Sequence, residues 1–243
     1  MTRTVLSLTG NDRHAFLDGL VTNVVPQPGA PLTYAALLTP QGKFIADFFL
    51  LAEADRLLVD VATSHAPTLF QRLSMYRLRA DVQIAETELA VSRGRGAAPD
   101  GAHPDPRHPE LGWRRIGSEA GDDGTDWAAL RVAHVIPETG IELTPETYIL
   151  EAGFERLSGV DFRKGCFVGQ EIVARMKHKT ELRKGLTRLA IDGEAPVGTE
   201  ITADGKAVGT LFTQSGGQAL AQVRFDRLDG ALVAGAARLA PLR

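Results

Sequence analysis

The first part of the chain alternates short apolar runs, typical of strands, with apolar positions three and four apart, typical of helices. Asn11 or Asp12 can cap a helix that continues through Phe16, Leu17 and Leu20, and Ser64 can cap a second helix through Leu69, Leu73 and Tyr76. Together the pattern predicts an α+β unit. The strand-like runs are Val5–Leu8, Tyr34–Leu38, Phe44–Leu51, Arg56–Val61, Asp81–Ile84 and Glu88–Val91.

Turn chemistry separates these elements. Thr39-Pro40-Gln41-Gly42 lies between two apolar runs and predicts a hairpin. Residues 94–126 are rich in Gly, Pro, Asp and Arg, so we expect mainly a surface loop there. Thr144-Pro145-Glu146 has the composition of a helix start, and the apolar spacing that follows predicts a helix to Leu157 that ends near Gly159.

The pattern changes from Leu186 onward. Short apolar runs alternate with glycine turns, no helical period persists, and the Asp-Gly pair at Asp204 is typical of a hairpin turn. These features predict a small antiparallel β-barrel. We therefore expect two domains, an α+β region over residues 1–183 and a C-terminal barrel over residues 184–243.

Composition narrows the class of protein. A chain of 243 residues with 44% hydrophobic residues can bury a substantial core. The formal charge of -3 gives no global reason to expect nucleic acid binding. No apolar run approaches the length of a membrane span, and no signal-peptide pattern opens the chain. The single cysteine excludes an intramolecular disulfide, which points to a reducing cytoplasm.

The densest chemistry in the chain is Lys164-Gly165-Cys166-Phe167-Val168-Gly169-Gln170-Glu171, called the octapeptide below. Its two glycines favour a turn, and the residues that follow favour a short helix. Cys166 is thus expected just before a helix N-terminus and next to cations, where a thiolate is favoured. The alternative, equally weighted from spacing alone, is that Cys166 is a small buried apolar residue.

The octapeptide resembles the signature of the YgfZ-type folate-binding proteins, relatives of the glycine-cleavage aminomethyltransferase (T-protein). Three other stretches agree with that resemblance in the same order. These are Gly10–Asn23, Leu38–Asp47 and Tyr76–Arg79. The resemblance implies an aminomethyltransferase-like folate-binding fold, in which residues 1–183 form two intertwined subdomains, with the barrel at the C-terminus.

The resemblance also implies site residues. Cys166 and Lys164 would be the catalytic pair, and tetrahydrofolate the expected cofactor. The pattern alone favours Asp47 on the solvent face of its strand, whereas its counterpart in the related aminomethyltransferases lies in the folate cavity. The residues expected to bind the cofactor are Asp47, Asn23, Arg79, Gln170 and Glu171.

Two features bear on the folate. Arg72, Arg77 and Arg79 lie close together at a helix end; they are either a solvated face or a docking patch for the glutamate tail of a folate or another anion. In the family, the stretch matching Arg131–Pro137 carries a glutamate that is expected to grip the pterin. Ala133 occupies that place here, so another acid such as Glu142, Glu151 or Glu155 takes over, or folate is bound differently or not at all.

Three functions follow. The first is a folate-type protein whose Cys166 thiolate serves iron–sulfur cluster assembly or repair, as the resemblance implies, with iron–sulfur proteins or assembly factors as partners. The second is an aminomethyltransferase that transfers a one-carbon unit to tetrahydrofolate. The third is an adaptor that has lost the ligand, which Ala133 favours. We expect no membrane association and no direct binding of nucleic acid.

Overall fold

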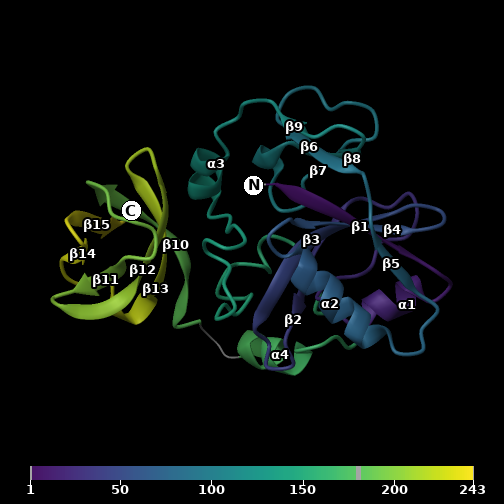
Figure 1. Cartoon of the computed structure of the whole chain (residues 1–243). Helices are drawn as coiled ribbons and strands as arrows, with labels where there is room; N and C mark the ends of the chain where they lie inside the picture. Colours follow the sequence, from purple (N-terminus) through teal and green to yellow (C-terminus); the bar gives the residue numbers. More distant parts are fainter. Residues whose placement is uncertain (1, 179–181, 243) are drawn as a thin grey trace. The chain divides into compact units, whose positions relative to one another are not determined.

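The structure, a computed structural model, describes residues 2–178 and 182–242. Tertiary contacts divide the chain into two compact units (Figure 1). The first comprises Met1–Thr125 and Phe154–Ala174, and the second comprises Asp126–Gly153 and Arg175–Arg243. Residues 126–153 thus group with the C-terminal barrel, whereas the sequence placed them in the N-terminal region.

The first unit is built on a five-stranded antiparallel sheet whose strand order is β2-β3-β4-β1-β5. All five strands lie at or within a few residues of the predicted runs, and the hairpin at Thr39–Gly42 is confirmed. The strands are β1 (Arg3–Thr9), β2 (Thr33–Leu38), β3 (Phe44–Ala52), β4 (Leu57–Ala62) and β5 (Gln83–Glu86).

Side chains alternate between the two faces of this sheet, as the period of a strand requires. One face carries apolar residues such as Leu37, Phe48 and Val59, which form a core cluster with Leu17 of α1 (Arg13–Asp18) and with Leu69 and Leu73 of α2 (Ala66–Arg77). The other face carries Tyr34, Asp47, Phe49 and Asp60, all buried. One face therefore holds the core, and the other holds buried polar groups.

Helix α1 begins at the predicted Asp12 without a side-chain cap, and α2 begins one residue later than predicted. Asp12 is the N-cap residue of α1, but its carboxylate accepts a hydrogen bond from the backbone N–H of Asp81 (2.8 Å) instead of one from the helix. The N-cap of α2 is His65, one residue after the predicted Ser64. The Asp12 carboxylate therefore binds the loop before β5 and does not cap α1.

The expectation of a mainly surface loop over residues 94–126 is wrong in part. This stretch completes a four-stranded sheet of order β7-β8-β6-β9 and contains a short 3-10 helix at Pro109–Leu111. Its residues Asp105 and Arg114 are buried. The strands are β6 (Ala90–Gly94), β7 (His103–Pro104), β8 (Trp113–Gly117) and β9 (Gly121–Asp122).

The predicted helix from Thr144 to Leu157 is absent from the described residues, where successive turns occupy that stretch. Gly153 and Ser158 both have left-handed backbone angles, with φ of 80° and 53°. Such angles interrupt a right-handed helix. Thr147 uses its hydroxyl within the turn, accepting a hydrogen bond from the backbone N–H of Thr144 (3.0 Å).

The second unit contains α3 (Trp127–His134) and a closed six-stranded barrel of order β10-β13-β12-β11-β14-β15. The barrel confirms the predicted antiparallel architecture, with β14 as a strand that the pattern missed. Asp204 and Gly205 form its predicted tight turn, with φ of 48° and 76°. Its strands are β10 (Lys184–Asp192), β11 (Glu200–Ala203), β12 (Lys206–Ser215), β13 (Gln218–Arg224), β14 (Leu232–Ala234) and β15 (Ala237–Pro241). The short helix α4 (Gln170–His178) follows the octapeptide, as predicted, and a second 3-10 helix spans Phe225–Arg227.

Candidate functional site

The octapeptide is fastened to the first unit by the side chain of Lys164, which is 2% exposed. Its Nζ atom donates hydrogen bonds to the backbone carbonyl oxygens of Asp18 and Val21, the latter at 2.9 Å. It also lies 3.5 Å from the Asp18 carboxylate. Burial lowers the pKa of Lys164, while the charges of Asp18, Asp161 and Cys166 act in the opposite direction. Lys164 therefore anchors the loop to the end of α1.

A second attachment follows the cysteine. Phe167 is buried, with its ring centroid 5.4 Å from the Lys164 Nζ atom, and Val168 packs against the core cluster. Gly169 has a φ of +84°, and a Cβ atom there would lie 2.6 Å from the Thr39 carbonyl oxygen. The backbone at the start of α4 thus contacts the turn of the β2–β3 hairpin at a distance that only glycine permits.

Between these two attachments, Gly165 and Cys166 are exposed. A Cβ atom added to Gly165 would meet nothing within 4 Å. The alternative interpretation of Cys166 as a buried apolar residue is therefore wrong. The single thiol of the chain is presented to solvent by a loop whose flanks are held in place.

The residues Gln170 and Glu171 come directly after this loop, at the start of α4. The Gln170 backbone N–H donates to the Phe167 carbonyl (3.1 Å), and Glu171 lies in the first helical turn, where a carboxylate is favoured by the helix dipole. The structure thus brings together four predicted site residues, Lys164, Cys166, Gln170 and Glu171. The role assigned to Gln170 and Glu171 in cofactor binding stays a prediction.

Asn23 is engaged in holding the chain that leads to the octapeptide. Its Nδ2 atom donates to the carbonyl oxygens of Tyr34 (2.9 Å) and Ser158 (2.8 Å), and its Oδ1 atom accepts from the Val24 N–H (2.8 Å). The neighbouring Thr22 hydroxyl donates to the Gly159 carbonyl (2.7 Å). Every polar atom of the Asn23 side chain is thereby occupied, so a ligand that used it would have to displace one of these bonds.

Asp47 is 4% exposed, so the expectation that it lies on the solvent face is wrong. It projects from the sheet face opposite to α1 and α2, where the Tyr34 hydroxyl donates to its Oδ2 atom at 2.8 Å. Burial and the nearby Asp47 charge together raise the pKa of Tyr34 well above its ordinary value, so the phenol keeps its proton.

The segment that was expected to be a loop supplies charged partners to this face. The Arg107 guanidinium forms two hydrogen bonds with the Asp105 carboxylate (3.0 and 2.7 Å) and lies over the rings of Phe49 and Tyr34 at 4.8 and 5.5 Å. Burial would lower the pKa of Arg107, but the Asp105 charge outweighs it, and the pKa is raised. Arg107 is thus a fixed cation.

A second ion pair adjoins the first. The buried Asp60 carboxylate accepts from Arg3 (2.5 Å) and from Arg114 (2.9 Å). Burial lowers the pKa of Arg114 to about 10. The sequence pattern did not indicate Asp105, Arg107 and Arg114, because the polar composition of residues 94–126 gives no periodic signal for buried charges. It also did not indicate Asp60, a single acid within an apolar strand whose partners Arg3 and Arg114 are distant in sequence.

Arg79 follows the C-terminal end of α2 by two residues and is exposed. None of the hydrogen bonds or ion pairs among the described residues links it to another predicted site residue. The structure therefore does not join Arg79 to the octapeptide.

In the second unit, Ala133 lies in α3, and its carbonyl oxygen accepts from Arg188 (2.7 Å). The proposed substitute acid Glu142 is buried and already satisfied. Its two oxygens accept from Arg131 (2.9 Å), the Glu138 N–H (2.9 Å) and the Thr213 hydroxyl (2.5 Å). Glu142 cannot take up a pterin without losing these donors. Val135, directly after α3, has a left-handed φ of 54°.

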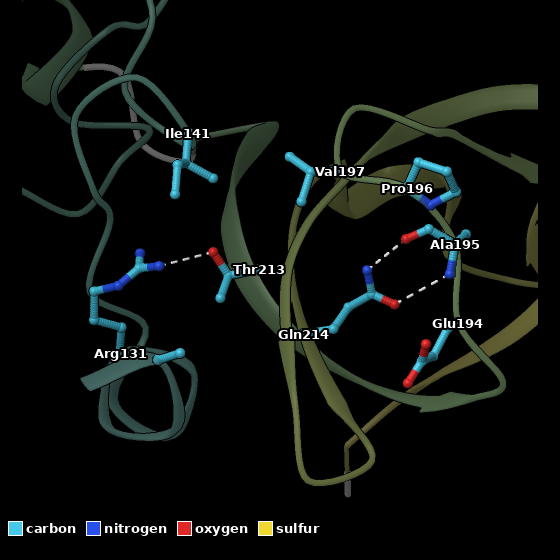
Figure 2. Close-up of a pocket in the computed structure, with 9 residues that line it drawn as sticks. Arg131, Ile141, Glu194, Ala195, Pro196, Val197, Thr213 and Gln214 are labelled. Carbon is cyan, nitrogen blue, oxygen red and sulfur yellow. Dashed lines mark hydrogen bonds between the residues drawn. The ribbon is translucent and has the colours of Figure 1, made fainter. Parts of the chain in front are cut away.

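A groove of about 730 Å³ lies in the second unit, beside α3 and the barrel. Figure 2 shows Arg131 and Ile141 on one side and Val197 and Pro196 on the other, with Thr213 hydrogen-bonded to Arg131 (2.9 Å). The Gln214 amide bridges to the backbone of Ala195. None of the predicted site residues lines this groove.

The described part of the chain has neither a cluster of metal-binding side chains nor a membrane-spanning helix. Residues 2–178 and 182–242 contain no group of three or more His, Cys, Asp or Glu side chains arranged to hold a metal ion. In the same ranges, no helix has both the length and the apolar content needed to cross a membrane.

Comparisons with known proteins bear on the fold and on the relatives. Residues 183–243 match the family model described as CAF17, C-terminal beta-barrel domain. The chain is 29% identical over 276 residues to the human protein named iron-sulfur cluster assembly factor IBA57, mitochondrial, covering 95% of this chain and 78% of that protein. The mouse protein of the same name is also 29% identical, with the same coverage.

The structure is similar to the crystal structure of glycine cleavage system aminomethyltransferase T from Bartonella henselae. The TM-score is 0.77 at 14% identity, covering 98% of this chain and 81% of that chain. This similarity confirms the α+β, aminomethyltransferase-like fold with a C-terminal barrel, and it shows the fold alone. The narrower assignment to the YgfZ-type family stays a prediction.

The expectation of a cytoplasmic location is wrong by the same comparisons. The human and mouse relatives, and those of Mycosarcoma maydis and Neurospora crassa, are all named as mitochondrial proteins. A single unpaired cysteine indicates a reducing compartment, and it does not distinguish one such compartment from another.

Proposed function

We propose that this protein assists the assembly or repair of iron–sulfur clusters and that the Cys166 thiolate is its working group. The observation that carries the proposal is the exposed Cys166 side chain on a loop anchored at Lys164 and Gly169. The names of the human and mouse relatives support the same function.

The chemistry proposed for Cys166 is ligand exchange. The thiol loses its proton to solvent, and the sulfur donates an electron pair to one iron of a cluster in place of another ligand, with no change of oxidation state. A single thiolate cannot hold a cluster, because clusters are bound by several cysteines. A partner protein therefore has to supply the other ligands, and the cluster is cargo rather than a resident cofactor.

Lys164 acts in this proposal as a positioning residue. Its hydrogen bonds to the Asp18 and Val21 carbonyls fix the start of the loop, so the exposed thiol is presented in one place. A presented thiolate loses less conformational entropy when it ligates iron than one on a free tail.

The test is complementation in cells that lack the protein, read out as the activity of their iron–sulfur enzymes. Cys166→Ser is expected to abolish support while leaving the fold intact. A matched control carries an exposed thiol at another place in the first unit. Ser118 is exposed, and the double variant Ser118→Cys/Cys166→Ser is expected to remain inactive. Full activity of the iron–sulfur enzymes with Cys166→Ser would show that the thiol has no part in the mechanism. Activity with the double variant would show that a thiol need not stand at position 166.

Tetrahydrofolate fits the residues only in part. Asp47 is buried as a cavity residue would be, but position 133 carries no carboxylate and Glu142 is held by Arg131 and Thr213. No step of the proposed function therefore uses a folate. Calorimetric titration with tetrahydrofolate is expected to show no heat of binding. Saturable binding that Asp47→Ala abolishes would show that the protein does bind tetrahydrofolate.

A further inference from the structure

Apolar side chains are exposed at the C-terminal end of α2. Leu69 and Leu73 on its inner side are fully buried, while Met75 is 61% exposed and Leu78 is 88% exposed. Among the large apolar side chains of residues 2–178 and 182–242, Leu78 is the most exposed. An exposed leucine next to an exposed methionine is unusual enough to call for a reason.

Leu78 is also held in a conformation that favours glycine. The Arg77 carbonyl accepts from the Ala80 N–H at 2.8 Å, which closes a β-turn with Leu78 in its second position. Leu78 has φ 46° and ψ -106°, close to the type II′ geometry in which glycine dominates that position. Such outliers persist where a function requires them, and this one directs an apolar side chain into water.

The same corner is positively charged. Residues 63–80 contain three arginines, Arg72, Arg77 and Arg79, and no Asp or Glu, although the whole chain has a net charge of -3. The next residue, Asp81, is an acid, but its carboxylate accepts hydrogen bonds from the backbone and side-chain N–H groups of Asn11 (3.1 and 3.0 Å). All three are exposed. In the part of the chain that the structure describes, none of the ion pairs involves any of them. The Arg77 guanidinium donates one long hydrogen bond to the Val82 carbonyl (3.5 Å), and its remaining N–H groups, with those of Arg72 and Arg79, can pair with carboxylates from outside the chain. We call Arg72, Met75, Arg77, Leu78 and Arg79 the α2 corner.

We propose that the α2 corner is the docking site for an acidic protein, whose surface offers an apolar recess for Leu78 with carboxylates around it. Arginine and methionine are both enriched at protein interfaces, and an arginine pairs with a carboxylate through two parallel hydrogen bonds. Leu78 is the anchor of the interface, and the three arginines select the partner by charge.

A protein explains the corner better than a small anion. The glutamate tail of a folate would pair with the arginines but would leave Leu78 and Met75 in water. A protein surface covers both. That the partner is an iron–sulfur protein rests on the proposed function, since Cys166 needs a second protein to supply cluster ligands. That an acidic protein docks at the α2 corner does not depend on the proposed function.

The first experiment replaces Leu78 with a photo-crosslinking amino acid in full-length protein expressed in cells lacking the native chain. Val233, an exposed side chain on the barrel, receives the same group as the matched control. We expect an adduct from Leu78, and none from Val233, with one protein that mass spectrometry identifies as acidic. Charge reversal in the double variant Arg77→Glu/Arg79→Glu is expected to reduce the adduct about tenfold or more.

The captured protein is then purified and titrated against wild-type protein. We expect the affinity to fall with added salt and to fall about tenfold or more in Arg77→Glu/Arg79→Glu. The proposal is overturned if Leu78 yields no adduct, if the adduct is with nucleic acid or lipid, if Val233 captures the same protein, or if charge reversal leaves the capture unchanged.

The two proposals can fail separately. If Cys166→Ser fails to support iron–sulfur enzymes but the charge-reversed variant supports them fully, the thiol function stands and the docking site is wrong. If Cys166→Ser supports them fully, the thiol function is wrong, while a charge-dependent Leu78 adduct still upholds the docking site.

Discussion

Gly169 lies so close to Gly42 that a Cβ atom on Gly169 would be 3.1 Å from the Gly42 Cα atom. Gly42, with a φ of +75°, is itself packed against the side chain of Ile172. The turn of the β2–β3 hairpin and the start of α4 therefore touch through two glycines. This contact and the Lys164 anchor hold the cysteine loop from both sides.

We predict that Gly169→Ala lowers the free energy of unfolding by about 2–4 kcal/mol, because the methyl group meets the Thr39 carbonyl and the φ is left-handed. Gly165→Ala in the same loop is the matched control. A Cβ atom there would meet nothing within 4 Å, so a change of less than about 1 kcal/mol is expected. Urea unfolding measures both, and equal losses in the two variants would contradict the close contact.

Lys164→Met is expected to destabilise the protein by about 1–3 kcal/mol, because the carbonyl oxygens of Asp18 and Val21 lose their donor. The neighbouring Arg163 is 93% exposed, and Arg163→Met should change stability by no more than about 0.5 kcal/mol. Thermal unfolding compares the pair. If both substitutions are neutral, Lys164 is not an anchor.

The Asp105 carboxylate should make stability depend on acidity. Burial acts to raise the pKa of Asp105, but Arg107 and Arg114 outweigh it and lower the pKa below its ordinary value of 3.8. Between the lowered pKa of the folded state and the ordinary pKa of 3.8, the folded state binds fewer protons at Asp105 than the unfolded state does. The stability that the Asp105 charge contributes is therefore complete above pH 3.8 and is lost as the pH falls through the folded-state pKa.

The measurement is urea unfolding between neutral and acid pH, comparing wild type with Asp105→Asn. The variant is expected to be less stable at neutral pH, because the buried Arg107 loses its charged partner. Its stability should also fall less steeply on acidification. Parallel pH profiles for the two proteins would mean that Asp105 does not carry this dependence.

Leu78→Gly is predicted to stabilise the fold by about 0.5–1 kcal/mol, because glycine accepts the turn geometry and the lost side chain is almost fully exposed. Met75→Gly is the control within the same helix and should destabilise by about 1 kcal/mol. The midpoints of denaturant unfolding of the two variants and of the wild-type protein test both expectations. A destabilised Leu78→Gly would show that Leu78 contributes to the fold rather than to docking.

Local pattern predicted the parts of the fold in which one face of an element is apolar. The hairpin around Thr39–Gly42, the helix α2 and the barrel all follow from apolar spacing and turn residues. The helix predicted at Thr144 is absent because the chain turns repeatedly there and takes a left-handed angle at Gly153. A sequence shows that a residue can adopt such an angle, but not that it does.

The sequence predicted the cysteine loop, but it did not predict the buried charged side chains. A cysteine flanked by glycines and a lysine is visible in the sequence, and its exposure follows once the loop is anchored. Asp60 and Arg114 are 54 residues apart and form an ion pair. Arg3 also binds the Asp60 carboxylate, and the Asp105 carboxylate lies 3.9 Å from Arg114. Burial of such charges depends on tertiary pairing, which no local period encodes.

The central claim is that the Cys166 sulfur can ligate the iron of a cluster when other thiolates are supplied, and glutathione can supply them in a defined experiment. Wild-type protein and Cys166→Ser are each incubated anaerobically with iron, sulfide and glutathione, separated from small molecules, and compared by visible absorption and by iron and sulfide content. We predict that wild-type protein retains a cluster chromophore with matching iron and sulfide, and that Cys166→Ser retains neither. Equal retention by the two proteins would contradict the account.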